Sequence, residues 1–304
     1  MKFFLRAWLL PLLCLLPLLV HAQGAEPRVV ALGWEAAEHL LKLGITPLAV
    51  ADAEDYRTWV VRPALPDGVP SAGSRTEPNL ELLAQLKPDL IVIPPLLDDI
   101  RGKLERIAPV LSFSSFSQEH DNYLASRDNY LELARHFGRE EQALSELAAM
   151  QARMDELHRR LVEHFHGQLP KVAVIRFSSP TAVFINGENS MADHAMRLLH
   201  LQPAYPLPRS PWGIVQAPVT TLGRIEQGVI LHIEPFAQQD QLFGTPLWQA
   251  MPFVREGRFA AMRSTWTYGG VFSIEYLGEA ITEALLGSVG VPAQAALSRE
   301  ISPG

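Results

Sequence analysis

Short apolar strands alternate with helices along this chain, and one helical run of unusual length interrupts the alternation. That run covers residues 140–165. Apolar residues recur in it at spacings of three and four, as expected for one face of a helix: Leu144, Leu147, Met150, Met154, Leu157 and Leu161. Because strands and helices alternate on both sides of the run, the chain is predicted to be an α/β protein with two lobes joined by a single long helix.

Before the long run, strands are predicted at 28–32, 47–51, 89–93 and 109–113, with helices at 35–43, 80–86, 100–107 and 122–137. After it, strands are predicted at 171–177, 182–185, 228–233 and 258–263. The predicted division is a signal peptide at 1–22, an N-terminal α/β lobe at 23–138, the connecting helix at 139–167 and a C-terminal α/β lobe at 168–295. A helical connector resists large hinge closure, because bending it would break backbone hydrogen bonds.

The first residues predict export. Lys2 and Arg6 precede an apolar stretch at 7–20, and Ala22 supplies the small residue typical of a signal-peptide cleavage site. The mature chain is therefore expected to begin near Gln23. A retained membrane helix is disfavoured, because a span needs roughly 20 apolar residues and this stretch is shorter and contains two prolines.

The only cysteine, Cys14, lies within the predicted signal peptide. The residues before it are too bulky for a lipoprotein cleavage pattern, so we expect Cys14 to be removed with the signal. Without cysteine, a mature chain has no disulfide or thiolate metal site. Its 24 basic and 33 acidic residues give a net charge of −9 with neutral histidines, which argues against binding nucleic acid.

Arg75 is the first candidate ligand contact. It lies in the segment SRTEPNLELLAQLKPDLIVI, on a loop ahead of a compact helix and a buried strand. Open α/β sheets hold ligands in crevices beside their strand ends, where this loop is expected. The alternative reading is an exposed arginine in a surface ion pair.

Five aromatic residues flank predicted turns in both lobes, and together they favour a shared aromatic cleft between the lobes. They are Trp34, Trp59, Trp212, Trp266 and Tyr268. For each tryptophan taken alone, the alternative is a lid over the hydrophobic core, since tryptophan is highly buried on average.

Several segments in order carry a resemblance to a known family: RVVALGWEAAEHLLKLGITPLAVAD, YRTWVVRPALPD, SRTEPNLELLAQLKPDL, LERIAPV, TPLWQAMPFVREGRF and STWTYGG. Together they resemble the periplasmic ferric-hydroxamate siderophore-binding proteins of the ferrichrome type, which are class III solute-binding proteins, over most of residues 28–286. The resemblance implies a periplasmic, monomeric protein that delivers an iron(III) siderophore to an inner-membrane ABC permease. It implies no catalysis, no cofactor and no protein metal ligands, because the siderophore holds the iron.

Position by position, the resemblance implies that Arg75 hydrogen-bonds the iron-coordinating hydroxamate oxygens and that the five aromatic residues form the wall of the pocket. A guanidinium offers forked donors without competing for iron, and aromatic faces cover an apolar ligand backbone. Met191 completes the expected contacts. Leu97, in PPLLDD, occupies the place of the family's pocket tyrosine. This departure leaves open whether a second hydrogen bond forms, and we expect a cleft suited to a bulkier or more apolar siderophore.

The resemblance also implies two acidic residues that meet permease arginines. Glu81 matches in the first lobe, whereas Leu222 occupies the matching place in the second and only Glu226 nearby could substitute. The alternative for Glu81 is a solvated surface charge.

Other functions remain as alternatives. A carrier of bare metal ions would need converging ligands, and the only close histidines, His158, His164 and His166, end the long helix. A hydrolase would need a positioned nucleophile, and the sequence contains no G-x-S-x-G. The same architecture could instead carry another iron siderophore, cobalamin or haem, with Tyr268 as the axial haem ligand.

Overall fold

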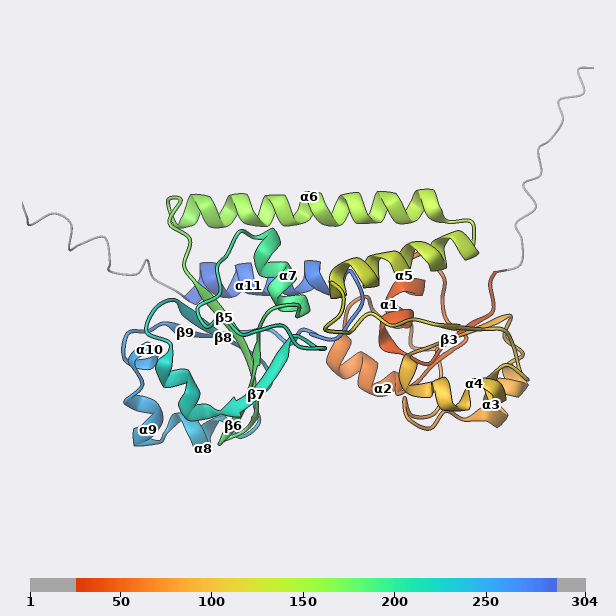
Figure 1. Cartoon of the computed structure of the whole chain (residues 1–304), viewed down its shortest axis with the longest axis horizontal. Helices are drawn as coiled ribbons and strands as arrows, with labels where there is room; N and C mark the ends of the chain where they lie inside the picture. Colours follow the sequence, from red (N-terminus) through yellow and green to blue (C-terminus); the bar gives the residue numbers. More distant parts are fainter. Residues whose placement is uncertain (1–25, 289–304) are drawn as a thin grey trace, which may run out of the picture.

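The computed structural model describes residues 26–288, so the predicted signal peptide with Cys14 and the chain beyond residue 288 lie outside the described residues. Two α/β lobes lie side by side along the long axis of the molecule, and α6 (Glu140–His164) runs across both (Figure 1). The predicted fold class is confirmed. At 25 residues, α6 closely matches the predicted long helix.

The N-terminal lobe contains a four-stranded sheet in the order β2-β1-β3-β4, with every pair parallel. Its strands are short, and each lies within or beside a predicted strand: β1 (Val29–Ala31), β2 (Ala49–Val50), β3 (Leu90–Ile93) and β4 (Val110–Ser112). Helices lie on both faces of the sheet: α1 (Trp34–Lys42), α2 (Ala53–Asp55), α3 (Leu80–Leu86), α4 (Arg101–Leu104) and α5 (Asn122–His136).

Both faces of this sheet are buried along β1, β2 and β3, which explains why these three strands are apolar throughout. Val29 and Ala31 of β1 belong to the core beneath α1 and α5, whereas Val30 between them belongs to the opposite core with Leu83 of α3. Side chains alternate across a strand, so a strand covered on both faces has no polar positions.

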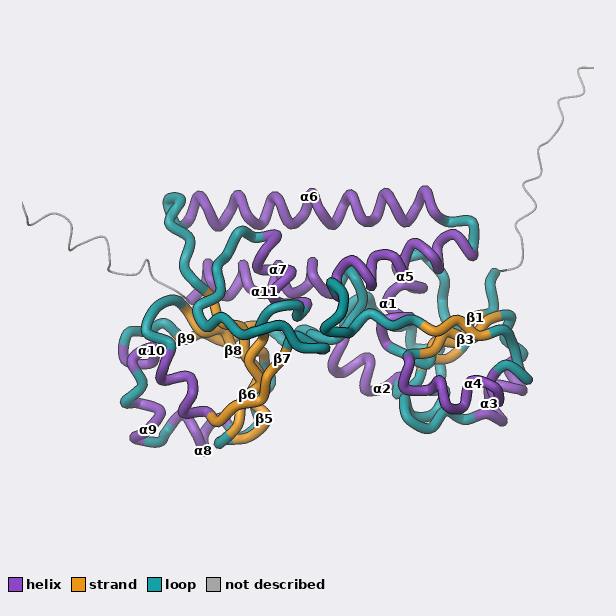
Figure 2. Tube along the Cα trace, viewed as in Figure 1, coloured by secondary structure: helices purple, strands orange, loops and turns teal. Residues whose placement is uncertain are grey.

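The C-terminal lobe contains a five-stranded mixed sheet in the order β7-β6-β5-β8-β9 (Figure 2). β8 and β9 run parallel to β5, whereas β6 and β7 are antiparallel to their neighbours. The strands are β5 (Val172–Ser179), β6 (Ala182–Asn186), β7 (Ile214–Pro218), β8 (Val229–Ile233) and β9 (Phe259–Met262).

The helices of this lobe also form two layers. Helices α6, α7 (Met191–Leu198) and α11 (Ser273–Ser288) cover one core. On the other side lie α8 (Gln239–Phe243), α9 (Pro246–Gln249) and α10 (Pro252–Arg255), whose core contains the buried Trp248. The sequence analysis did not predict β7 or these helices. β7 begins after a left-handed glycine, ends on Pro218 and contains no buried residue, so its pattern is weak.

Candidate ligand-binding site

The carboxyl ends of all four parallel strands converge on one edge of the N-terminal sheet. Residues 33–35 follow β1, Asp52 follows β2, 94–96 follow β3 and 113–116 follow β4. All four segments contribute residues to one cavity. Ligand crevices in open α/β sheets form at such carboxyl ends, so the strand order itself positions this wall.

The C-terminal lobe closes the other side of the cavity with three aromatic residues. Trp212 precedes β7, and Trp266 and Tyr268 lie on the segment that leaves β9. The enclosed volume is about 910 Å³, which is the size of a pocket for a drug-sized or larger ligand. The cavity therefore lies between the lobes, as the sequence predicts.

Arg75 reaches this cavity from a loop held by a local turn. Its backbone N–H and its Nε both donate to Oδ2 of Asp52, each over 3.1 Å. Gly73 adopts φ +95° beside this turn, and a Cβ there would lie 2.6 Å from the backbone nitrogen of Asn79. Only glycine fits such a position without strain.

The Arg75 guanidinium lies over the Trp34 ring, with 3.6 Å from Cζ to the ring centroid. Trp34 is itself fixed, because its Nε1 donates to the Ala51 carbonyl over 2.9 Å. Within residues 26–288, Nη1 and Nη2 of Arg75 donate no hydrogen bond, and the side chain is 38% exposed. Arg75 therefore forms an ion pair with Asp52 through Nε, as the alternative interpretation of this residue expects. It still presents the forked end of its guanidinium to the cavity.

The aromatic residues form a continuous chain from one lobe to the other and back. The Trp34 and Trp266 ring centroids are 4.8 Å apart, and Trp266 lies 5.3 Å from Tyr268. Trp212 then lies 5.5 Å from Tyr268 and stacks on Phe116 at 4.7 Å. Edge-to-face and stacked pairs at these distances are favourable, so the wall is ordered before any ligand arrives.

A buried carboxyl group joins the two lobes beneath this wall. Glu38 of α1 accepts hydrogen bonds from the backbone N–H groups of Gly270 and Phe272 and from the Ser273 hydroxyl. Burial raises the pKa of Glu38 to about 7. A Cβ on Gly270 would lie 2.7 Å from Oε1 of Glu38, so the glycine permits this contact. The segment bearing Trp266 and Tyr268 is thereby anchored to the N-terminal lobe.

The structure does not bring three of the predicted contacts to the cavity. Trp59 packs partly buried against the N-terminal core, and Met191 is buried among α7 and α11. Leu97 is 2% exposed and belongs to the core on the other face of the N-terminal sheet. Its neighbour Leu96, 64% exposed, lines the cavity instead, because the 3₁₀ turn Pro95–Ile100 directs successive side chains to different sides.

The predicted docking residues lie away from the cavity lining. Glu81 is exposed in the first turn of α3, and Glu226 is exposed before β8. The Glu226 backbone carbonyl accepts a hydrogen bond from Arg258, which fixes the loop that carries it. Leu222 is fully buried in the C-terminal core, so its side chain cannot face a partner.

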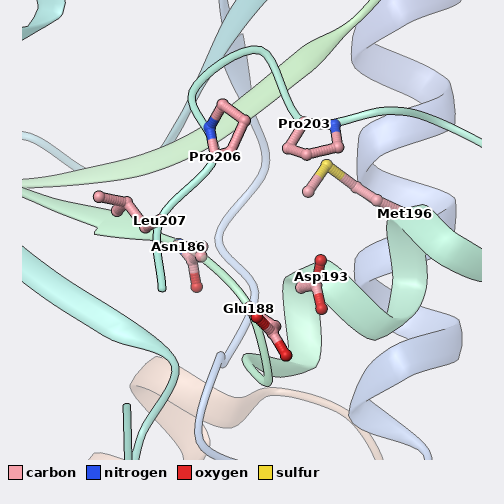
Figure 3. A pocket seen from close by; sticks show the side chains of 8 residues that line it. Asn186, Glu188, Asp193, Met196, Pro203, Pro206 and Leu207 are labelled. Atoms are coloured by element: carbon pink, nitrogen blue, oxygen red, sulfur yellow. The ribbon is translucent and has the colours of Figure 1, made fainter. Parts of the chain in front are cut away.

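A second and much smaller cavity, about 180 Å³, lies within the C-terminal lobe (Figure 3). Glu188 and Asp193 line it, and each is paired with an arginine. None of the predicted site residues contributes to it.

The histidines at the end of the long helix do not converge. His158 stacks on His200, and His164 packs against Phe165. Among residues 26–288, no group of three or more His, Cys, Asp or Glu side chains could hold a metal ion. Nor does any helix in that range combine the length and apolar composition that crossing a membrane requires.

The sequence analysis missed several lining residues, including Glu35, Asp52, Phe113 and Phe116. A usable signal was present, because Asp52 and Phe116 follow predicted strands, Phe113 ends one, and Glu35 lies next to Trp34. Residues directly following parallel strands are candidates for any ligand crevice.

Residues 29–265 match the periplasmic binding protein family, and the chain belongs to that family. The chain is 33% identical to the iron(3+)-hydroxamate-binding protein FhuD of Escherichia coli K12, over 93% of this chain and 97% of FhuD. It is 41% identical to the siderophore-binding protein FhuD of Vibrio cholerae, whose crystal structure contains Fe3+-Desferal. That comparison has a TM-score of 0.85 and covers 88% of this chain and all of the other.

A more distant structure shares the fold. FhuD2 of Staphylococcus aureus with bound ferrioxamine B gives a TM-score of 0.70 at 16% identity, covering 86% of this chain and 99% of that protein.

Proposed function

We propose that this protein binds ferric hydroxamate siderophores in the interlobe cavity. The observation that carries the proposal is the Arg75 guanidinium, which keeps its forked end free beside a continuous aromatic wall. The similarity to FhuD of Escherichia coli and of Vibrio cholerae supports the same ligand class.

The chemistry of the cavity suits such a ligand. Hydroxamate oxygens that coordinate iron stay electron-rich, and a guanidinium donates charge-assisted hydrogen bonds to them. Trp212, Trp266 and Tyr268 would cover the apolar backbone of the siderophore. The siderophore supplies all the iron ligands, so the protein needs no cofactor and performs no catalysis in this role.

Delivery to an inner-membrane ABC permease completes the proposal. The protein would be exported by the signal peptide at 1–22 and act as a monomer in the periplasm. Glu81 and Glu226, one exposed on each lobe, are the proposed contacts for permease arginines.

Tryptophan fluorescence provides the test, because three of the tryptophans line the cavity. Mature protein is titrated with ferrichrome, ferrioxamine B, a ferric catecholate, haem, cobalamin and ferric chloride. Saturable one-to-one quenching by the ferric hydroxamates is expected, with no binding of bare ferric ion. Equal affinity for bare iron would refute the siderophore role, and tighter binding of haem, cobalamin or the catecholate would reassign the cargo.

A further inference from the structure

Glu35 lies in the wall of the ligand cavity, next to Trp34 in the first turn of α1. A glutamate in an aromatic ligand cavity is costly if it is charged, because a buried carboxylate needs a cation or several donors. Glu35 forms no ion pair with any residue of 26–288, and Arg75 in the same cavity is paired with Asp52 instead.

The hydrogen bonds around Glu35 distinguish the roles of its two carboxyl oxygens. Hydroxyls of Ser115 and Ser126 both donate to Oε1, the second over 2.9 Å. Asn129 Nδ2 donates to Ser115 Oγ over 2.8 Å, so the Ser115 hydrogen is directed to Glu35. An oxygen that accepts two hydroxyl hydrogens behaves as the carbonyl oxygen of a carboxylic acid. In a neutral acid the proton therefore belongs on Oε2, the oxygen to which these serines do not donate.

A second buried carboxyl group lies one turn away from Glu35. Glu38 lies three residues along α1 and is held by two backbone N–H groups and the Ser273 hydroxyl. Two buried carboxylates so close together do not both ionise readily. Burial raises the pKa of Glu35, and hydrogen bonds from Ser115, Ser126 and Asn129 only partly oppose that effect.

We propose that Glu35 is a ligand-binding residue that presents a neutral carboxylic acid to the cavity and donates a hydrogen bond from Oε2 to an oxygen of the ferric hydroxamate. This inference rests on the proposed function. It supplies a second donor beside Arg75 in a cavity where Leu97, at the expected position of a tyrosine, is buried in the core. A carboxylic acid, like a phenol, donates one hydrogen bond without carrying charge.

The test compares Glu35→Gln and Glu35→Leu with wild type, using ferrioxamine B and ferrichrome at pH 7. Glutamine keeps a neutral donor of similar length, so binding within about threefold of wild type is expected. Leucine removes the donor and should weaken both ligands by roughly tenfold, equivalent to about 1.4 kcal/mol. The matched control is Glu141→Gln, an exposed first-turn glutamate of α6, which should change nothing.

Three outcomes would overturn the proposal. Glu35→Leu could bind both ligands as wild type does, or Glu35→Gln could lose as much affinity as Glu35→Leu. Alternatively, Glu35→Gln could weaken only ferrioxamine B, which carries a free ammonium group, and that result would identify Glu35 as a charged acceptor. Failure of wild type to bind any ferric hydroxamate would instead refute the proposed function, so the two failures are distinguishable.

Infrared spectroscopy gives a readout that does not depend on affinity. The difference spectrum of wild type minus Glu35→Gln at pH 7 should contain the C=O band of a protonated carboxylic acid. Carboxylate bands alone would contradict the proposal. A pH series extends the measurement, and it must account for the other titratable or charged groups around Glu35 and the cavity: Glu38, Asp52, Arg75, His120 and Tyr268.

Discussion

The two lobes contribute different chemistry to the same cavity. The N-terminal wall carries polar groups beside the carboxyl ends of parallel strands: Glu35 in the first turn of α1, and Asp52 and Arg75 on the connection after β2. The C-terminal wall is aromatic, and Trp266 and Tyr268 on it belong to one crossing segment. Polar groups require exact placement to form hydrogen bonds, whereas aromatic faces tolerate small shifts. We infer that the N-terminal lobe orients the ligand and the C-terminal lobe covers it.

These different roles depend on the contact between Glu38 and residues 270–273, which joins the two walls. Glu38→Ala removes the acceptor for the Gly270 and Phe272 N–H groups and for the Ser273 hydroxyl, and leaves these donors buried. Unfolding free energy should fall by about 2–4 kcal/mol, because each unpaired buried donor costs roughly 1–3 kcal/mol. Chemical denaturation measures this change, with Glu141→Ala as the exposed control. A loss equal to that of the control would mean the interlobe contact is dispensable.

The same contact makes a prediction about pH. Burial raises the pKa of Glu38 from 4.5 to about 7, so the folded state binds the proton more tightly than the unfolded state. Glu38 should therefore add stability as pH falls from about 7 to 4.5, and remove it as pH rises again. Glu38→Gln eliminates the titrating group. As pH falls from about 7 to 4.5, the unfolding free energy of wild type should increase relative to that of Glu38→Gln. A difference that does not depend on pH would contradict the assignment.

Arg75 tests the orienting role of the N-terminal wall. Arg75→Ala should weaken ferrioxamine B binding by roughly tenfold to a hundredfold, because a hydrogen bond to a charged group contributes about 1.5–3 kcal/mol. Folding should change little, since the side chain is partly exposed. Arg101→Ala, which removes an exposed ion pair on α4, is the control. If both variants bind equally well, Arg75 has only a structural role through Asp52.

The sequence predicted the elements that set the cavity more accurately than the side chains that line it. Alternating apolar strands and the 140–165 periodicity are local patterns, and they placed α6 and the N-terminal strands within a few residues. One cavity is lined by Arg75, Trp34, Trp212, Trp266 and Tyr268, and their role as ligand contacts stays a prediction. Leu97 differs because the side to which a side chain points in a short 3₁₀ turn depends on a shift of one residue.

Trp59 shows a second limit of sequence reasoning. A tryptophan in a loop carries the same local signal whether it faces a ligand or the core, and here the helical turn Tyr56–Val60 packs it against the N-terminal core. Glu35 was missed for the opposite reason. Charged residues are normally exposed, so nothing local indicated that this one is held by two serines from distant segments.

The covering role of the C-terminal wall is tested by comparing two tryptophans. Trp212 is 51% exposed, stacks on Phe116 and meets Tyr268 edge-to-face. Trp212→Ala should therefore weaken binding by about two- to tenfold while folding is retained. Trp59→Ala should lower the unfolding free energy but leave affinity unchanged, since Trp59 does not line the cavity. Fluorescence titration of both variants shows which of the two tryptophans contributes to ligand binding. Equal losses of affinity would show that Trp59 also contributes to the binding site.

The smallest expected effect distinguishes two adjacent leucines on the orienting wall. Leu96 lines the cavity and Leu97 lies in the core, so a tyrosine hydroxyl could reach a hydroxamate only from position 96. Leu96→Tyr should tighten binding by about 0.5–1.5 kcal/mol, the usual net contribution of one hydrogen bond. Leu97→Tyr should instead overpack the core, costing about 1–3 kcal/mol of stability with little change in affinity. Calorimetric affinities and denaturation midpoints for both variants separate the two effects. Tighter binding by Leu97→Tyr with undiminished stability would place position 97, and not 96, at the ligand.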